Sequence, residues 1–132
     1  MIKGFVVKLL AVDDEKGITD LLCKFFSDLG FHITSVNTGD EALKAIQSDK
    51  PDIVFLDITL GTVSGLDILE KIKRIDPSIK VIMLTVHGKK EMMDKAKELG
   101  ADEYIRKPFS MDYLEKIVLM KIHELMNEKG VK

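Results

Sequence analysis

The sequence predicts an α/β fold of the doubly wound kind, in which a five-stranded parallel sheet carries helices on both faces. Two observations support this prediction. Five short apolar runs alternate with five amphipathic stretches along 132 residues, and strands separated by helices form right-handed βαβ units. Several of the runs are continuously apolar, which is typical of strands covered on both faces.

The five apolar runs are the predicted strands, and they end at polar or turn-forming residues. They cover residues 7–12, 33–36, 53–56, 81–85 and 104–105. The stretches between them carry apolar residues at helical spacing. The first helix is expected to end at Gly30 and the fourth at Gly100, because glycine favours the left-handed C-cap conformation. The other expected boundaries are a start near Thr38 for the second helix, an end before Pro77 for the third, and about Met111 to Met126 for the fifth.

Composition excludes several classes of protein. Hydrophobic residues make up 45% and charged residues 32%, as in a folded globular domain. The net charge of −2 provides no basic field for nucleic acid, so we expect no direct nucleic-acid binding. Cys23 is the only cysteine, which rules out an intrachain disulfide and suits a reducing compartment.

The length and the ends of the sequence indicate one domain. The apolar start is too short to span a bilayer and is interrupted by Lys8, so we expect no membrane contact and a cytoplasmic location. There is no internal repeat or linker, and few residues follow the fifth helix. We therefore expect a single domain over residues 1–132, with no second, output domain in the chain.

Polar residues stand where the predicted strands end. Asp13 and Asp14 follow the first strand, Asp57 the third, and Thr85 ends the fourth, while Lys107 follows the fifth. In open parallel α/β sheets, ligands bind beyond the carboxyl ends of the strands. We therefore expect three carboxylates, a hydroxyl and an ammonium at one edge of the sheet.

Three neighbouring carboxylates repel one another, which raises their pKa values or demands a cation. Mg²⁺ suits such a site, because it prefers oxygen ligands, keeps several waters and accepts phosphate oxygens. With the lysine as a second positive charge, the site is complementary to a transferring phosphoryl group.

Four segments carry a resemblance to a known family: residues 10–15 (LAVDDE), 51–57 (PDIVFLD), 81–85 (VIMLT) and 100–109 (GADEYIRKPF). In this order and spacing they resemble the receiver domains of two-component response regulators, from about residue 7 to residue 126. The resemblance implies a flavodoxin-like (βα)5 fold with strand order 2-1-3-4-5, related to that of the chemotaxis response regulator.

The resemblance also implies roles for the acids. Asp57 corresponds to the phosphoacceptor, a carboxylate that forms an acyl phosphate. Asp14 corresponds to the direct Mg²⁺ ligand and Asp13 to the acid that holds the ion mainly through water. Asp57 and the backbone carbonyl of Thr59 complete the protein's ligands. A simpler role for Asp13 and Asp14, compatible with the first, is to stabilise the start of the first helix.

Three further residues match positions with known roles in the family. Lys107 corresponds to the lysine that pairs with phosphoryl oxygens, and the Lys107–Pro108 bond is expected to be cis. Thr85 corresponds to the hydroxyl that hydrogen-bonds a phosphoryl oxygen, and Tyr104 to the aromatic residue of the switch. The alternatives are a surface lysine, a threonine that initiates a turn, and a half-buried edge tyrosine.

The implied function is that of a signalling switch and not of an enzyme with its own substrate. A sensor histidine kinase or a phosphotransfer protein donates the phosphoryl group, and slow autodephosphorylation ends the signal. The face made by helix four, strand five and helix five then meets a downstream effector, and self-association through that face gives a homodimer as a further option.

The sequence departs from the usual family pattern at two places. Gly61 and Thr62 stand where many relatives have proline and glycine, which predicts a more mobile loop after Asp57. Val86 stands where alanine or glycine is usual, and its side chain is expected to narrow the approach to Asp57. Thr59 and His87 occupy positions that tune the phosphoryl lifetime in this family, although His87 would equally suit a solvated loop.

The sequence also permits two other interpretations. Residues 57–62 (DITLGT) also resemble the aspartyl-phosphate motif of haloacid-dehalogenase-type hydrolases. That family places its nucleophile after the first core strand, with further acids downstream, and this sequence does neither. The second is a degenerate receiver that only binds a partner. Such domains typically lack the acceptor, an acid or the lysine, and all are present here.

Overall fold

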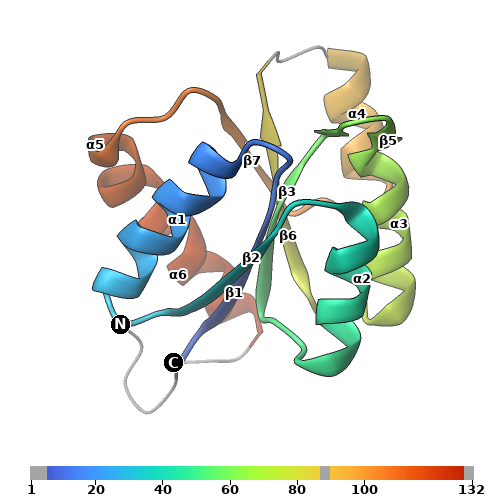
Figure 1. The fold of residues 1–132 in the computed structure, drawn as a ribbon. Coiled ribbons are helices and arrows are strands. Elements are labelled where there is room, and N and C mark those ends of the chain that lie inside the picture. Colours follow the sequence, from blue (N-terminus) through green and yellow to red (C-terminus); the bar gives the residue numbers. More distant parts are fainter. Residues whose placement is uncertain (1–5, 87–89, 130–132) are drawn as a thin grey trace.

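The computed structural model describes residues 6–86 and 90–129, and it confirms the predicted fold class (Figure 1). Five parallel strands form the sheet in the order β2-β1-β3-β6-β7, which is 2-1-3-4-5 along the chain. The elements are β1 (Lys8–Val12), α1 (Lys16–Asp28), β2 (His32–Val36), α2 (Gly39–Ser48), β3 (Ile53–Asp57), β4 (Thr59–Leu60), β5 (Val63–Ser64), α3 (Gly65–Ile75), β6 (Lys80–Thr85), α4 (Lys90–Glu98), β7 (Glu103–Arg106), α5 (Met111–Tyr113), a π-helical turn (Leu114–Val118) and α6 (Leu119–Glu128).

Helices cover both faces of the sheet. Figure 1 shows α1, α5 and α6 on one face and α2, α3 and α4 on the other. All five residues of β3 are buried, which explains why its sequence is continuously apolar. Along β1, Leu9 and Ala11 pack under α1, whereas Leu10 and Val12 pack under α2 and α3. This alternation follows from the two-residue period of a strand.

The helix boundaries follow the local sequence. Gly30 and Gly100 have φ of 91° and 103°, so glycine ends α1 and α4 in the left-handed region as predicted. The side chain of Thr38 caps α2 by accepting the N–H of Glu41 at 3.1 Å. Among the described residues, no helix combines the length and the apolar character needed to cross a membrane.

Two local features differ from the expectations. The fifth helical segment is not one regular α-helix, because a π-helical turn over Leu114–Val118 separates α5 from α6, which extends to Glu128. The segment after Asp57, expected as a loop, contains the antiparallel pair β4–β5. Strands this short carry no sequence period, so the apolar pattern could not predict them.

Candidate functional site

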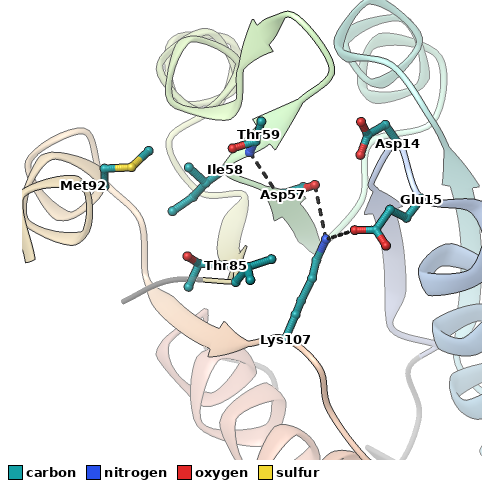
Figure 2. Close-up of a pocket in the computed structure, with 9 residues that line it drawn as sticks. Asp14, Glu15, Asp57, Ile58, Thr59, Thr85, Met92 and Lys107 are labelled. Carbon is teal, nitrogen blue, oxygen red and sulfur yellow. Dashed lines mark hydrogen bonds and ion pairs between the residues drawn. The ribbon is translucent and has the colours of Figure 1, made fainter. Parts of the chain in front are cut away.

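Asp57 is the buried acid at the centre of the carboxyl edge of the sheet (Figure 2). Its Oδ1 accepts the backbone N–H of Thr59 at 3.2 Å, and its Oδ2 lies 3.3 Å from Nζ of Lys107. Lys107 follows β7 and is itself buried, and its backbone N–H donates to the carbonyl of Thr85 at 2.8 Å. The Lys107–Pro108 peptide bond is cis. Two chain segments 50 residues apart therefore meet as a buried ion pair.

A close backbone contact fixes the position of Asp57. Gly65 begins α3, and its N–H donates to the carbonyl of Ile58 at 2.6 Å. A Cβ at position 65 would lie 2.0 Å from the carbonyl oxygen of Asp57. Only glycine permits this approach of α3 to the end of β3.

Asp13 follows β1 and is completely buried. Its Oδ2 lies 2.6 Å from Nζ of Lys107, an ion pair without the geometry of a directed hydrogen bond. Its Oδ1 accepts the N–H of Glu15 at 2.9 Å, and the side-chain amide of Asn37 donates to its carbonyl at 2.8 Å. These contacts tie the carboxyl ends of β1 and β2 together.

Asp14 is exposed, and its Oδ2 accepts the backbone N–H of Gly61 at 3.0 Å. Asp13, Asp14 and Asp57 each offer a ligand atom, and these three atoms lie within 4.8 Å of one another. This is the only group of three such residues that the described part of the chain brings together. Carboxylate oxygens at this spacing suit a hard divalent cation such as Mg²⁺.

The charges at this edge change the acidity of the group at its centre. Burial and then the neighbouring charge of Asp13 raise the pKa of Asp57 to about 6, although the N–H of Thr59 and the ammonium of Lys107 act in the opposite direction. Burial alone would lower the pKa of Lys107, but contacts with Asp13, Asp57 and Glu15 outweigh it and raise that pKa above its ordinary value. Lys107 is therefore a charged ammonium throughout the physiological range.

A cavity of about 460 Å³ opens beside Asp57. Its charged wall is formed by Asp14, Glu15, Asp57 and Lys107. The remaining wall is formed by uncharged residues: Ile58, Thr59, Thr85, Val86 and Met92. Thr85 is buried at the end of β6, whereas half of the surface of Val86 is exposed. The cavity gives a ligand access to the carboxylate from the side of α4, where Figure 2 places Met92.

Tyr104 lies on β7 and does not line this cavity. Its ring is half-buried against the core under α3 and α4, and its hydroxyl donates to the carbonyl of Met93 in α4 at 2.8 Å. Its switch role is a prediction that this geometry leaves untested. His87, whose position is expected to tune the phosphoryl lifetime, lies outside the described residues.

The structure adds two contacts that the sequence analysis missed. Oε1 of Glu15 lies 3.2 Å from Nζ of Lys107, so a fourth acid shares the lysine. Its position directly after Asp13 and Asp14 was a signal that could have suggested it. The second is the hydrogen bond from the N–H of Gly61 to Asp14. The residues Gly61 and Thr62 had indicated only a more mobile loop.

The chain matches the family model described as the response regulator receiver domain over residues 9–119. It is 37% identical over 111 residues to sporulation initiation phosphotransferase F of Bacillus subtilis (strain 168), which covers 84% of this chain and 90% of that protein. It is 45% identical over 102 residues to response regulator SaeR of Staphylococcus epidermidis, which covers 77% of this chain and 44% of SaeR. The chain thus spans nearly all of the first relative and less than half of the second.

Solved structures give the same result. A CheY-like response regulator receiver domain protein from Methanospirillum hungatei JF-1 superposes with a TM-score of 0.86 at 28% identity, over 94% of this chain and 99% of that one. NtrX from Brucella abortus superposes with a TM-score of 0.86 at 34% identity, over 96% of this chain and 29% of that one. The chain therefore belongs to the family of response regulator receiver domains, the signalling domains of two-component systems.

Proposed function

We propose that this receiver domain accepts a phosphoryl group on Asp57, in a Mg²⁺-dependent reaction, from the phosphohistidine of a sensor histidine kinase or a phosphotransfer protein. The observation that carries the proposal is the buried carboxylate of Asp57, which faces the ammonium of Lys107 at 3.3 Å and opens onto a cavity. A carboxylate nucleophile next to a fixed positive charge is the arrangement that phosphoryl transfer requires.

The residues present fit a Mg²⁺ ion. Asp13, Asp14 and Asp57 supply oxygen ligands within a small volume, and the backbone carbonyl of Thr59 would complete the set. Among the described residues, the ammonium of Lys107 pairs with Asp13, Glu15 and Asp57. Asp14 adds a further carboxylate beside Asp13 and Asp57, so the negative charge at this site exceeds the positive charge of Lys107. When bound, Mg²⁺ supplies positive charge that reduces the repulsion between the carboxylates and the incoming phosphoryl oxygens.

The chemical step forms one bond and breaks one. An oxygen of the Asp57 carboxylate attacks phosphorus, the P–N bond to the donor imidazole breaks, and its electron pair leaves with the imidazole. Lys107 neutralises charge on the phosphoryl oxygens and Thr85 donates a hydrogen bond to one of them. Because these contacts form only with the phosphoryl group, they can shift the balance between inactive and active conformations.

The same residues also suggest which surface of the domain changes on phosphorylation. Movement of Thr85 toward the phosphoryl group would change the packing around Tyr104, whose hydroxyl binds α4. The face made by α4, β7 and the α5–α6 segment would then present an altered surface to a downstream effector or to a second copy of the chain. Phosphorylation-dependent change confined to this face is the expected result in an amide-exchange comparison.

Residues lining the cavity are proposed to set the rates. Val86 projects beside the route to Asp57, so Val86→Ala should speed labelling by a small phosphodonor. Thr59 lines the same cavity, and Thr59→Asn should change the rate of acyl phosphate decay without preventing its formation. His87 lies outside the described residues, and from the family resemblance alone we propose the same outcome for His87→Ala. Unchanged labelling and decay in these variants would remove the rate-setting roles.

The direct test is incubation with acetyl phosphate and Mg²⁺, followed by mass spectrometry of the intact protein. The wild-type chain should gain the mass of one phosphoryl group, and Asp57→Asn or an excess of chelator should prevent it. A wild-type chain that no phosphodonor labels would contradict the proposal and favour a domain that only binds partners. Continuous hydrolysis of small phosphate esters would instead favour a hydrolase.

A further inference from the structure

The segment between Asp57 and α3 is a short antiparallel hairpin. Thr59 pairs with Ser64 and Leu60 with Val63, which leaves Gly61 and Thr62 as a two-residue loop. Gly61 has φ of 61°, and no other kind of residue in the described chain has a positive φ. Glycine at the first central position, with positive φ there and not at the second, is the pattern of a type II′ turn.

This hairpin touches two of the three clustered acids through its backbone. The N–H of Thr59 donates to Oδ1 of Asp57 at 3.2 Å, and the N–H of Gly61 donates to Oδ2 of Asp14 at 3.0 Å. The two donors are two residues apart, the period at which groups along an extended strand face the same side. The hairpin therefore connects an acid at the end of β3 with an acid that follows β1.

Residue 61 can make this contact only with a particular backbone. Proline has no N–H, and its ring fixes φ near −65°, so it would lose both the donor and the observed turn. A Cβ at position 61 would meet nothing within 4 Å. Steric crowding therefore does not explain why glycine occurs at position 61. The backbone conformation and the N–H are what matter.

We propose that Gly61 is a positioning residue for the metal site, because its N–H holds the Asp14 carboxylate toward Asp13 and Asp57. This inference rests on the proposed function, since it assigns Asp14 to the cation. The reason for the role is the exposure of Asp14, whose side chain would otherwise be free to turn into solvent. Hydrogen bonds that orient a metal ligand typically change metal affinity by about 10–100-fold.

The test measures Mn²⁺ binding by the electron paramagnetic resonance signal of the free ion, with no phosphodonor present. Mn²⁺ is a suitable probe because it accepts the same oxygen ligands as Mg²⁺. Gly61→Pro, which lacks the N–H, should bind Mn²⁺ about tenfold more weakly than the wild-type chain. Gly61→Ala keeps the N–H but strains the same φ, and it should lie closer to wild type.

Two further variants separate the hydrogen bond from other effects. In the first variant, glycolic acid replaces Gly61, so that an ester takes the place of the amide between residues 60 and 61. This change removes the N–H and leaves the rest of the backbone nearly unchanged. This variant should also lose about tenfold in affinity. Gly30→Ala strains a positive φ of 91° at the end of α1, and its Mn²⁺ affinity should equal that of wild type.

The outcomes distinguish the two proposals. If wild type binds Mn²⁺ and the ester variant binds it equally well, the role of Gly61 is wrong while the metal site stands. If wild type binds no Mn²⁺, the metal site itself is wrong and the role of Gly61 falls with it. Weak binding by the ester and proline variants, with normal binding by Gly30→Ala, supports the inference.

Discussion

The carboxyl ends of the sheet strands and their amino ends carry similar residues in opposite arrangements. We call these two ends of the sheet the carboxyl edge and the amino edge. At the carboxyl edge, the ammonium of Lys107 is shared by Asp13, Glu15 and Asp57. At the amino edge, by contrast, one acid, Asp102, has several cationic and N–H partners. Asp102 lies 3.0 Å from Nζ of Lys73 and accepts the N–H of Val81 at 2.9 Å, with further partners nearby. An edge with excess acid can take up a cation, whereas an edge with satisfied acids holds the strands in place.

The acidity of the carboxyl groups shows the same contrast. At the carboxyl edge, burial raises the pKa of Asp57 to about 6. At the amino edge, a hydrogen bond from Lys50 holds the pKa of Asp76 well below its ordinary range, and one from Lys8 lowers that of Asp49. A raised pKa means that folding disfavours the charged form, so ionised Asp57 destabilises the folded chain. The lowered pKa values of Asp76 and Asp49 mean that their ionised forms do not.

The largest expected effect comes from removing the shared cation. Lys107→Met leaves Asp13 and Asp57 buried without a counter-charge, and breaking a buried ion pair typically costs about 3–5 kcal/mol. We expect a loss of this size in the free energy of unfolding at pH 7 in chelator, measured by urea denaturation. Saturating Mg²⁺ should restore part of it, because a cation bound to the folded state alone stabilises that state.

Lys73→Met at the amino edge is the matched control. Lys73 is also largely buried, with Asp102 and the carbonyl of Ile79 as partners, so its loss should destabilise the chain as well. Mg²⁺ should not rescue this variant, because in the part of the chain that the structure describes the acids that could hold a cation together are Asp13, Asp14 and Asp57, at the other edge. Equal rescue of both variants would break the proposed contrast between the edges.

The second prediction is that Asp57→Asn stabilises the chain. The pKa of Asp57 is about 6 in the folded state against an ordinary value of 3.8, so the folded state holds the proton more tightly. Stability from this group is therefore lost as pH rises from about 4 to about 6, and the full penalty remains at pH 7. Without metal, we expect Asp57→Asn to gain about 1–3 kcal/mol at pH 7.

The pH dependence provides the control for this substitution. Well below pH 3.8 the wild-type carboxyl is protonated in both the folded and the unfolded state, and the advantage of asparagine should disappear. Thermal denaturation in chelator at about pH 3 and at pH 7 measures the difference. A variant less stable than wild type at pH 7 would show that ionised Asp57 does not carry the penalty described here.

The third prediction is the same substitution at the other edge, with the opposite sign. Asp102→Asn removes the negative partner of Lys73 but can still accept the N–H of Val81. Hydrogen bonds to charged groups contribute about 1.5–3 kcal/mol, and with one contact retained we expect a loss of about 1–2 kcal/mol. Urea denaturation at pH 7 beside Asp57→Asn tests the pair, and equal signs would contradict the comparison.

The sequence predicted most of the fold, because its signals are local. Continuous apolar runs indicate buried strands, and Gly30, Thr38 and Gly100 mark helix ends through their own backbone or side-chain chemistry. The candidate site was predicted as a set of residues at strand ends. Its detailed contacts were not, because they depend on how distant strands are aligned.

Two contacts illustrate this limit. Glu15 and Lys107 are 92 positions apart, and Asp14 and Gly61 are 47 positions apart. No periodicity within a segment can reveal such pairs. At Gly61 the sequence rule for glycine predicts mobility, whereas the structure shows a hairpin whose backbone binds an acid. Protection of the Gly61 amide in exchange experiments would decide between these two descriptions.

The smallest expected effect is at Tyr104, which lies on β7 between the two edges. Its hydroxyl donates to the carbonyl of Met93, and a neutral hydrogen bond of this kind contributes about 0.5–1.5 kcal/mol. Tyr104→Phe should therefore lower the free energy of unfolding by about 1 kcal/mol. Amide exchange should increase mainly in α4, because the ring keeps its packing while that helix loses its tether. An increase spread equally over both edges would mean that the tyrosine supports the whole sheet and not this one helix.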